Sequence, residues 1–135
     1  MVGTSTALGE PVTVKAVVQS LHDGRLVLQG PMSTGMTISL GDTAVIKVGG
    51  VQIVLASDRA QNYDRQFFSA FGIDPAAQQL LCVKSAQHFR ADYGSIASGI
   101  AVVDEGGGIC SHRLDKLEYE NVRRPVWPLD SFELD

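Results

Sequence analysis

Short runs of apolar residues divide the first part of the chain into β-strand candidates. Residues 12–19 (VTVKAVVQ) and residues 25–29 (RLVLQ) are rich in β-branched and aliphatic side chains, which favour strands. Residues 22–24 (His-Asp-Gly) lie between them and carry a turn signal. We therefore predict that the two strands pair as a hairpin.

A second hairpin is predicted over residues 44–56. Residues 44–48 and 51–56 are mostly apolar, and Gly49-Gly50 between them is a two-residue turn that hairpins favour. Polar–apolar alternation is weak in residues 51–56, so we expect that strand to be buried on both faces. Residues 30–41 (GPMSTGMTISLG) connect the two hairpins. Their glycine and proline content leaves two alternatives open, a binding loop and a plain connector.

The spacing of three phenylalanines predicts a helix over residues 65–71. Asn62 and Asp64 are candidate caps for its N-terminus, and Gly72 is well placed to end it. The three rings recur at i, i+1 and i+4 and are expected to face the core rather than to form a ligand site. They are Phe67, Phe68 and Phe71.

The second half of the chain predicts shorter elements. Asp74 is a candidate N-cap, with Pro75 at the first position of a helical turn. A strand is expected over residues 80–83, a helix over residues 87–98 and a further strand over residues 100–104.

These elements and the composition together indicate a fold class. The chain has 135 residues, of which 44% are hydrophobic and 19% charged, enough for one domain with a real core. We expect an α/β or α+β fold: a single domain with a mixed β-sheet, two hairpins and two or three helices. The small polar residues 1–11 are expected to form an N-terminal lead-in segment or linker, and residues 12–135 the domain.

Charge and hydropathy exclude several classes of function. The net charge of −4, from 11 basic and 15 acidic side chains, argues against a general nucleic-acid binder, which needs a basic face. No apolar run approaches the roughly 20 residues that a membrane span needs. The N-terminus carries no secretion signal. We therefore expect a cytoplasmic protein that contacts neither nucleic acid nor a membrane.

The densest group of reactive side chains follows the strand predicted over residues 80–83. It consists of Lys84, Ser85, His88 and Arg90, and in open α/β sheets ligands bind beyond the ends of strands. On a helix Ser85 and His88 would share a face, and Arg90 suits carboxylate recognition. In the structural alternative, Ser85 caps a helix and His88 bonds the backbone. Arg90 then pairs with an acidic neighbour: Asp92, Asp104 or Glu105.

This group is not completed into a known catalytic motif. The sequence contains no HExxH, CxxC, GxSxG or P-loop motif. Its three histidines, His22, His88 and His112, are scattered and do not by themselves form a zinc ligand set. Cys82 is expected to be a small buried hydrophobe rather than to pair with Cys110. A domain that completes another domain's site is therefore favoured over a self-contained enzyme.

Several short motifs occur in an order and spacing that cover nearly the whole chain from about Gly30. They are Gly30-Pro31-Met32 with Gly35, Leu40-Gly41-Asp42-Thr43-Ala44-Val45, Gly72-Ile73-Asp74-Pro75, Val83-Lys84-Ser85 with His88-Phe89-Arg90-Ala91, and Arg124-Pro125 with Pro128-Leu129-Asp130. The Lys-Ser-x-x-His-Phe-Arg string and the proline-rich tail are the more specific ones. With these motifs the sequence resembles the C-terminal domain of the microcystinase C (MlrC) family of zinc metallopeptidases.

The resemblance implies a two-domain enzyme that hydrolyses amide bonds of small peptides, including linearised microcystin. The zinc ligands are expected in the larger N-terminal domain, of which this chain has no counterpart. Neither zinc binding nor peptidase activity therefore carries over to this chain alone. What carries over is a contribution to the cleft between the domains. His88 and Arg90 are the candidate catalytic residues, and Lys84 and Ser85 the candidate substrate-binding residues.

The implied partners are a zinc-bearing N-terminal domain or subunit and a small peptide substrate. We expect an exposed apolar patch where that domain docks, and self-association of the isolated chain as a homo-oligomer that buries the patch. Two alternatives stay open. One is a stand-alone, non-catalytic module with the same fold that binds a small molecule or acts as a scaffold, and the other is an independent small-molecule enzyme.

Overall fold

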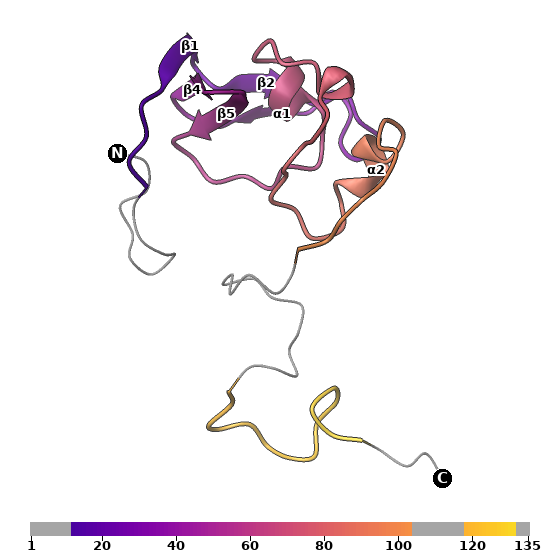
Figure 1. The fold of residues 1–135 in the computed structure, drawn as a ribbon. Helices are drawn as coiled ribbons and strands as arrows, with labels where there is room; N and C mark the ends of the chain where they lie inside the picture. Colours follow the sequence, from indigo (N-terminus) through magenta and orange to yellow (C-terminus); the bar gives the residue numbers. More distant parts are fainter. Residues whose placement is uncertain (1–11, 104–117, 132–135) are drawn as a thin grey trace. The chain divides into compact units, whose positions relative to one another are not determined.

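A computed structural model describes residues 12–103 and 118–131 (Figure 1). The chain divides into two compact units, Thr13–Ile100 and Ala101–Asp135 with Met1–Val12, and each is described by itself. The first unit holds two small sheets of antiparallel strands and three short helices, which confirms the predicted combination of sheet and few helices. Among the described residues, no helix is long and apolar enough to cross a membrane.

The larger sheet has three strands in the order β1 (Val17–His22), β4 (Thr43–Val48) and β5 (Val51–Ala56). β4 and β5 form the hairpin predicted from the two central glycines, with Gly49 at a φ of 58°. Glycine adopts this conformation without steric cost, so the local signal was sufficient. The expected burial of β5 on both faces is wrong, because β5 lies at the end of the strand order and its residues are half-buried or exposed.

β1 pairs with β4 rather than with the strand that follows it, so the first predicted hairpin is wrong. Instead, β2 (Arg25–Val27) pairs with β3 (Thr37–Ser39) in a second sheet of two strands. The chain passes from one sheet to the other at Gly24, which has a φ of 70°. A Cβ there would lie 1.9 Å from the carbonyl oxygen of Gly41, so the crossing point admits only glycine.

The hydrophobic core of this unit combines both sheets with α1 (Gln66–Ser69). Phe67 and Phe71 are buried, and Phe68 packs against them, which confirms the predicted aromatic face. Leu28 is fully buried. The buried members of the core are Leu26, Leu28, Leu40, Val45, Phe67, Phe71 and Ile73.

The ends of the first two helices follow the sequence signals. Gly72, with a φ of 81°, lies just beyond α1 and acts as the predicted stop. A 3₁₀ helix, η1 (Pro75–Ala77), begins at the predicted proline. Its predicted cap is confirmed, because Oδ1 of Asp74 accepts a hydrogen bond from the N–H of Ala76 at 2.9 Å.

The third helix is much shorter than predicted. α2 (Arg90–Tyr93) covers only part of the helix expected over residues 87–98. It stops at Gly94, and residues 94–96 continue as turns. Glycine has a low helix propensity, which accounts for the early end.

The strand predicted over residues 80–83 is absent, since no other described strand pairs with this segment. Cys82 is exposed, so its expected burial is wrong. Residues 100–103 form no strand either. The last residue of that predicted strand, Asp104, and the second cysteine, Cys110, lie outside the described residues.

In the second unit, one turn is well defined between Arg124 and Asp130. Nε of Arg124 donates a hydrogen bond to Oδ2 of Asp130 at 2.6 Å, and the N–H of Val126 donates to the same oxygen at 2.6 Å. The turn leaves Trp127 exposed.

Candidate functional site

Lys84, Ser85 and His88 lie on the segment that leads into α2, and Arg90 is the first residue of that helix. No strand precedes them, so the expectation of a site at a strand end is wrong. The carbonyl oxygen of Lys84 accepts a hydrogen bond from the N–H of Asn62 at 3.4 Å, which joins this segment to the loop before α1. The side chains of Lys84, His88 and Arg90 are exposed, and that of Ser85 is half-buried.

Gln61 connects two of these residues. Its Nε2 lies 3.0 Å from Oγ of Ser85 and 3.2 Å from Nδ1 of His88. The expected shared helix face is wrong, because both residues precede α2, and the amide of Gln61 brings them together instead. No local pattern marks Gln61, since it lies 24 and 27 residues from its partners.

Arg90 begins α2, with its side chain at the protein surface. Its Nε donates to Oε1 of Gln87 at 3.1 Å, and its guanidinium carbon lies 5.3 Å from the centre of the Phe89 ring, a cation–π contact. The pairing with Asp92 is wrong, because Asp92 binds Arg65. The other two acidic candidates lie outside the described residues: Asp104 and Glu105.

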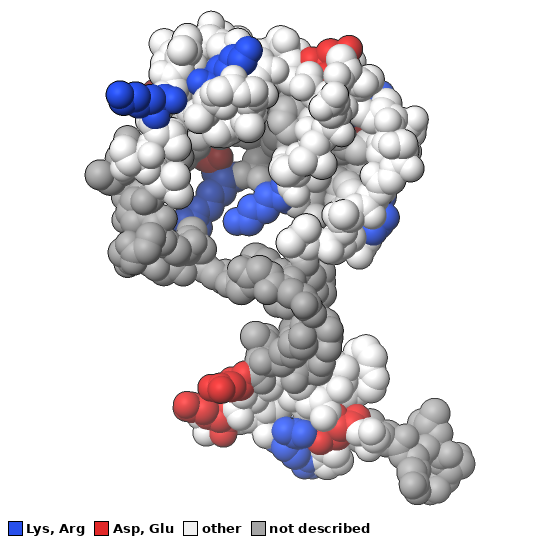
Figure 2. Space-filling view, in the orientation of Figure 1, with Lys and Arg blue, Asp and Glu red and all other residues white. Residues whose placement is uncertain are grey.

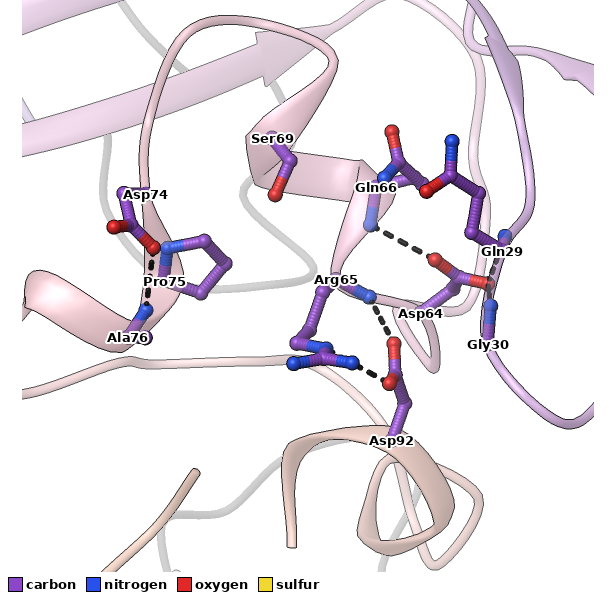
Figure 3. Close-up of a pocket in the computed structure, with 10 residues that line it drawn as sticks. All are labelled: Gln29, Gly30, Asp64, Arg65, Gln66, Ser69, Asp74, Pro75, Ala76 and Asp92. Atoms are coloured by element: carbon purple, nitrogen blue, oxygen red, sulfur yellow. Dashed lines mark hydrogen bonds and ion pairs between the residues drawn. The ribbon is translucent and has the colours of Figure 1, made fainter. Parts of the chain in front are cut away.

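Two buried aspartates, Asp64 and Asp92, form the aspartate pair shown in Figure 3. Only 2% of Asp64 and 4% of Asp92 is exposed. Oδ2 of Asp64 accepts hydrogen bonds from the N–H groups of Gln29 (3.0 Å) and Gly30 (2.7 Å). Oδ2 of Asp92 accepts from the N–H of Arg65 (2.7 Å), and its Oδ1 from Nε of Arg65 (2.8 Å). These donors compensate the charges that burial would otherwise destabilise.

Gly30 lies against both members of the aspartate pair. A Cβ at this position would lie 2.9 Å from Oδ2 of Asp64 and 2.9 Å from Oδ2 of Asp92. The backbone therefore makes a close approach at Gly30, toward side chains of the same chain. The Gly30-Pro31 signal marks a packing position at Gly30.

Tyr93 joins α2 to the loop before α1. Its hydroxyl donates toward Oδ1 of Asn62 (2.6 Å) and the carbonyl oxygen of Asp64 (2.9 Å). Burial raises the pKa of Tyr93 well above its ordinary value, and nearby Asp92 and Asp64 raise it further, against the lowering effect of the Asn62 bond. Tyr93 therefore stays a neutral donor. The predicted N-cap of α1 is wrong, because Arg65 holds that position and no side chain caps it. Asp64 lies just before Arg65, and its Oδ1 accepts a hydrogen bond from the N–H of Gln66 at 2.8 Å.

A cavity of about 170 Å³ lies beside the aspartate pair, with Ser69 and Asp74 also on its wall (Figure 3). No buried side-chain nitrogen or oxygen in the described residues lacks a hydrogen-bond partner. The same residues contain no group of three or more His, Cys, Asp or Glu side chains placed to hold a metal ion. We interpret the aspartate pair as structural. It fixes the loop that carries Gln61 relative to α2, which carries Arg90.

Only a few positively charged side chains lie near the candidate residues. On the face of the Thr13–Ile100 unit seen in Figure 2, the Lys and Arg side chains are few and do not merge into one continuous basic surface. Lys84 and Arg90 are both exposed on the segment that also carries His88. Such isolated donors suit one carboxylate or one carbonyl oxygen, for which one or two charged hydrogen bonds suffice.

Comparisons with known proteins give the family. The family model described as MlrC C-terminus matches residues 2–121. Microcystinase C from Sphingomonas sp. is 27% identical over 124 residues, which are 92% of this chain and 23% of that protein. A crystal structure described as a "putative metallopeptidase" from Mesorhizobium sp. BNC1 aligns with a TM-score of 0.72 and 26% identity, covering 89% of this chain and 24% of that one. The chain thus spans about a quarter of the length of these two relatives, and it belongs to the MlrC C-terminus family.

Proposed function

We propose that this chain is the C-terminal domain of an MlrC-like zinc metallopeptidase that hydrolyses amide bonds of small peptides of the linearised microcystin type. The observation that carries the proposal is the family match over residues 2–121 combined with coverage of only 23% and 24% of the two relatives. The chain would act with a zinc-bearing N-terminal domain or subunit in the cytoplasm, and would complete the cleft that binds the substrate.

Zinc belongs to the partner domain in this proposal. The described residues do not fit a zinc site, because they bring no three His, Cys, Asp or Glu side chains together. Structural zinc sites have four protein ligands and catalytic sites three. In this proposal, the chain binds and orients the peptide.

His88 supplies a hydrogen-bond donor in this proposal. Its Nδ1 accepts from the amide of Gln61, which assigns the ring proton to Nε2. A neutral imidazole with Nε2–H can donate to the amide oxygen of the substrate as negative charge develops there. A donor held in place by a second side chain loses less entropy when it binds.

Arg90 is proposed to bind a substrate carboxylate, with Lys84 and Ser85 contributing to the same subsite. The contact of Arg90 with the Phe89 ring and its bond to Gln87 limit the rotation of the guanidinium. A guanidinium with restricted rotation suits paired hydrogen bonds to a carboxylate.

The experiment compares His88→Ala and Arg90→Ala in the protein that contains both domains. We expect His88→Ala to lower kcat by on the order of a hundredfold, as loss of an oxyanion donor does. Arg90→Ala is expected to act mainly on KM, because it removes binding of the carboxylate. Arg25→Ala, an exposed arginine on β2, is the matched control and should leave both constants unchanged.

Two outcomes would overturn the proposal. One is unchanged peptidase kinetics in both variants with folding intact, which would remove His88 and Arg90 from the site. The other is a genome in which no coding segment upstream of or beside that of this chain specifies a zinc domain. The alternative hypothesis, a stand-alone binding module, would then be favoured over the proposed function.

A further inference from the structure

One face of the three-stranded sheet packs against the core cluster, and the other face points away from it. Val45 and Val54 are paired across β4 and β5 and point into the core. His22 of β1 lies on the same face, with its ring 5.0 Å from that of Phe71. Residues alternate between faces along a strand, so the register assigns a second set to the opposite face. We call this set the outer sheet face: Val18, Leu21, Ala44, Ile46, Val48, Val51, Ile53 and Leu55.

Every residue of the outer sheet face is apolar. Leu21 is 76% exposed, Val51 60% and Val18 58%. Ala44, Val48, Ile53 and Leu55 are half-buried, and Ile46 on the central strand is buried, with 6% exposed. An antiparallel sheet with one face on the core normally carries polar side chains on its other face. A contiguous apolar surface of this kind marks an interaction site. None of the eight residues belongs to the core cluster of the unit, although Ile46 is buried outside it.

We propose that the outer sheet face is the docking surface for the domain that the relatives carry in addition to the matched region. The inference rests on the proposed function, since it requires a second domain. The relatives extend well beyond the matched region, which covers 23% and 24% of their lengths. The family is described as the C-terminus of MlrC, so the additional domain precedes the matched region, which begins at residue 2.

The position of β1 favours this occupant over a second copy of the chain. A preceding domain connects to the Thr13–Ile100 unit through the residues just before Val17, where β1 begins. β1 also carries Val18 and Leu21, two of the most exposed residues of the outer sheet face. The connection from a preceding domain therefore reaches the unit at β1, an edge strand of the sheet that forms this face. The face has no charged side chain, so it fits an apolar surface on the preceding domain.

The test measures the reactivity of a cysteine placed on the outer sheet face. Leu21→Cys is prepared both in the 135-residue chain and in the protein that contains both domains, and its labelling by a maleimide is followed at that position by peptide mass spectrometry. We expect labelling at least about tenfold slower in the two-domain protein, because the reagent then reacts only when the interface opens. Val27→Cys, at a site 48% exposed on the other sheet, is the control and should react equally in both.

Equal labelling of Leu21→Cys in the two proteins would overturn the inference. Protection that appears in the isolated chain and grows with its concentration, without further protection in the two-domain protein, would also overturn it and identify a second copy as the occupant. The readout does not depend on catalysis. Docking can therefore be confirmed while the kinetics of His88→Ala and Arg90→Ala reject the proposed function, or the reverse.

Discussion

At the scale of single residues, the aspartate pair shows how one glycine sets the position of two buried charges. Asp64 and Asp92 both reach the space that a side chain at position 30 would occupy. Their donors are mostly backbone N–H groups, whose directions are fixed by the path of the chain at Gly30 and Arg65. A carboxylate buried without such donors would be destabilised by several kcal/mol, or would bind a proton instead.

Replacing Gly30 with alanine tests this packing. We expect Gly30→Ala to lower the free energy of unfolding by about 1–3 kcal/mol, the usual cost of overpacking a tight site. Urea denaturation measures the effect. Gly50→Ala is the control, because nothing lies within 4 Å of a Cβ there, and its change should stay within about 0.5 kcal/mol. Equal stability of the two variants would show that the site at Gly30 can expand.

Removing the amide of Gln61 tests how His88 is held. We expect the Nε2–H tautomer to dominate in the unaltered chain and to lose population in Gln61→Ala, since Nδ1 loses its donor. Nitrogen chemical shifts of the ring report the tautomer at about pH 8.5, where histidines are ordinarily neutral.

Gln78→Ala is the matched control for this experiment, because the amide of Gln78 binds the carbonyl oxygen of Asp74 instead. The control should leave the His88 tautomer unchanged. An unaltered tautomer ratio in Gln61→Ala would mean that the contact does not fix the ring.

Residues whose partners are close in sequence were predictable, and the others were not. The roles of Asp74 and Gly72 depend on their immediate neighbours, and both occur as predicted. Asp64 is predicted only as a helix cap. Its bonds to Gln29 and Gly30 span 35 and 34 residues, and no local pattern encodes them.

The same limit applies to whole elements. The β4–β5 hairpin follows from two adjacent glycines, whereas the pairing of β1 with β4 skips the second sheet entirely. The apolar run at residues 80–83 has the composition of a strand, but it pairs with no strand in the part of the chain that the structure describes. The composition of a segment shows only that it is compatible with a strand. Whether a strand forms depends on pairing with a neighbouring strand.

The turn between Arg124 and Asp130 predicts a measurable pH dependence. The hydrogen bond from Arg124 and that from the N–H of Val126 lower the pKa of Asp130 from 3.8 to about 2. Because the folded pKa is depressed, the turn is fully stabilised above the ordinary value and loses this stabilisation as the pH falls through about 2. The carboxyl carbon shift of Asp130 in an acid titration measures the midpoint.

Arg124→Ala separates the contribution of the ion pair. We expect its midpoint to move back toward 3.8, with the remaining difference due to the N–H of Val126. A midpoint near 3.8 in the unaltered chain would mean that the turn is not formed in solution.

For the molecule as a whole, motif order sufficed to predict the family, and the family match confirms it. The resemblance also predicts an apolar docking patch, without indicating where it lies. The outer sheet face takes residues from three strands, and only the observed register shows that they share one side. The assignments of Lys84, Ser85, His88 and Arg90 stay predictions, because they depend on a cleft with another domain.

The distances in sequence across the aspartate pair bear on the order of folding. Its hydrogen bonds join residues 29 and 30 to residue 64, and residue 65 to residue 92, across loops of up to 35 residues. Closing such loops lowers the conformational entropy of the chain before the long-range hydrogen bonds can stabilise it. We therefore expect the β4–β5 hairpin, closed by two glycines, to form early. The loop that carries Gln61 and the helix that carries Arg90 are expected to reach their final arrangement late, when the aspartate pair closes.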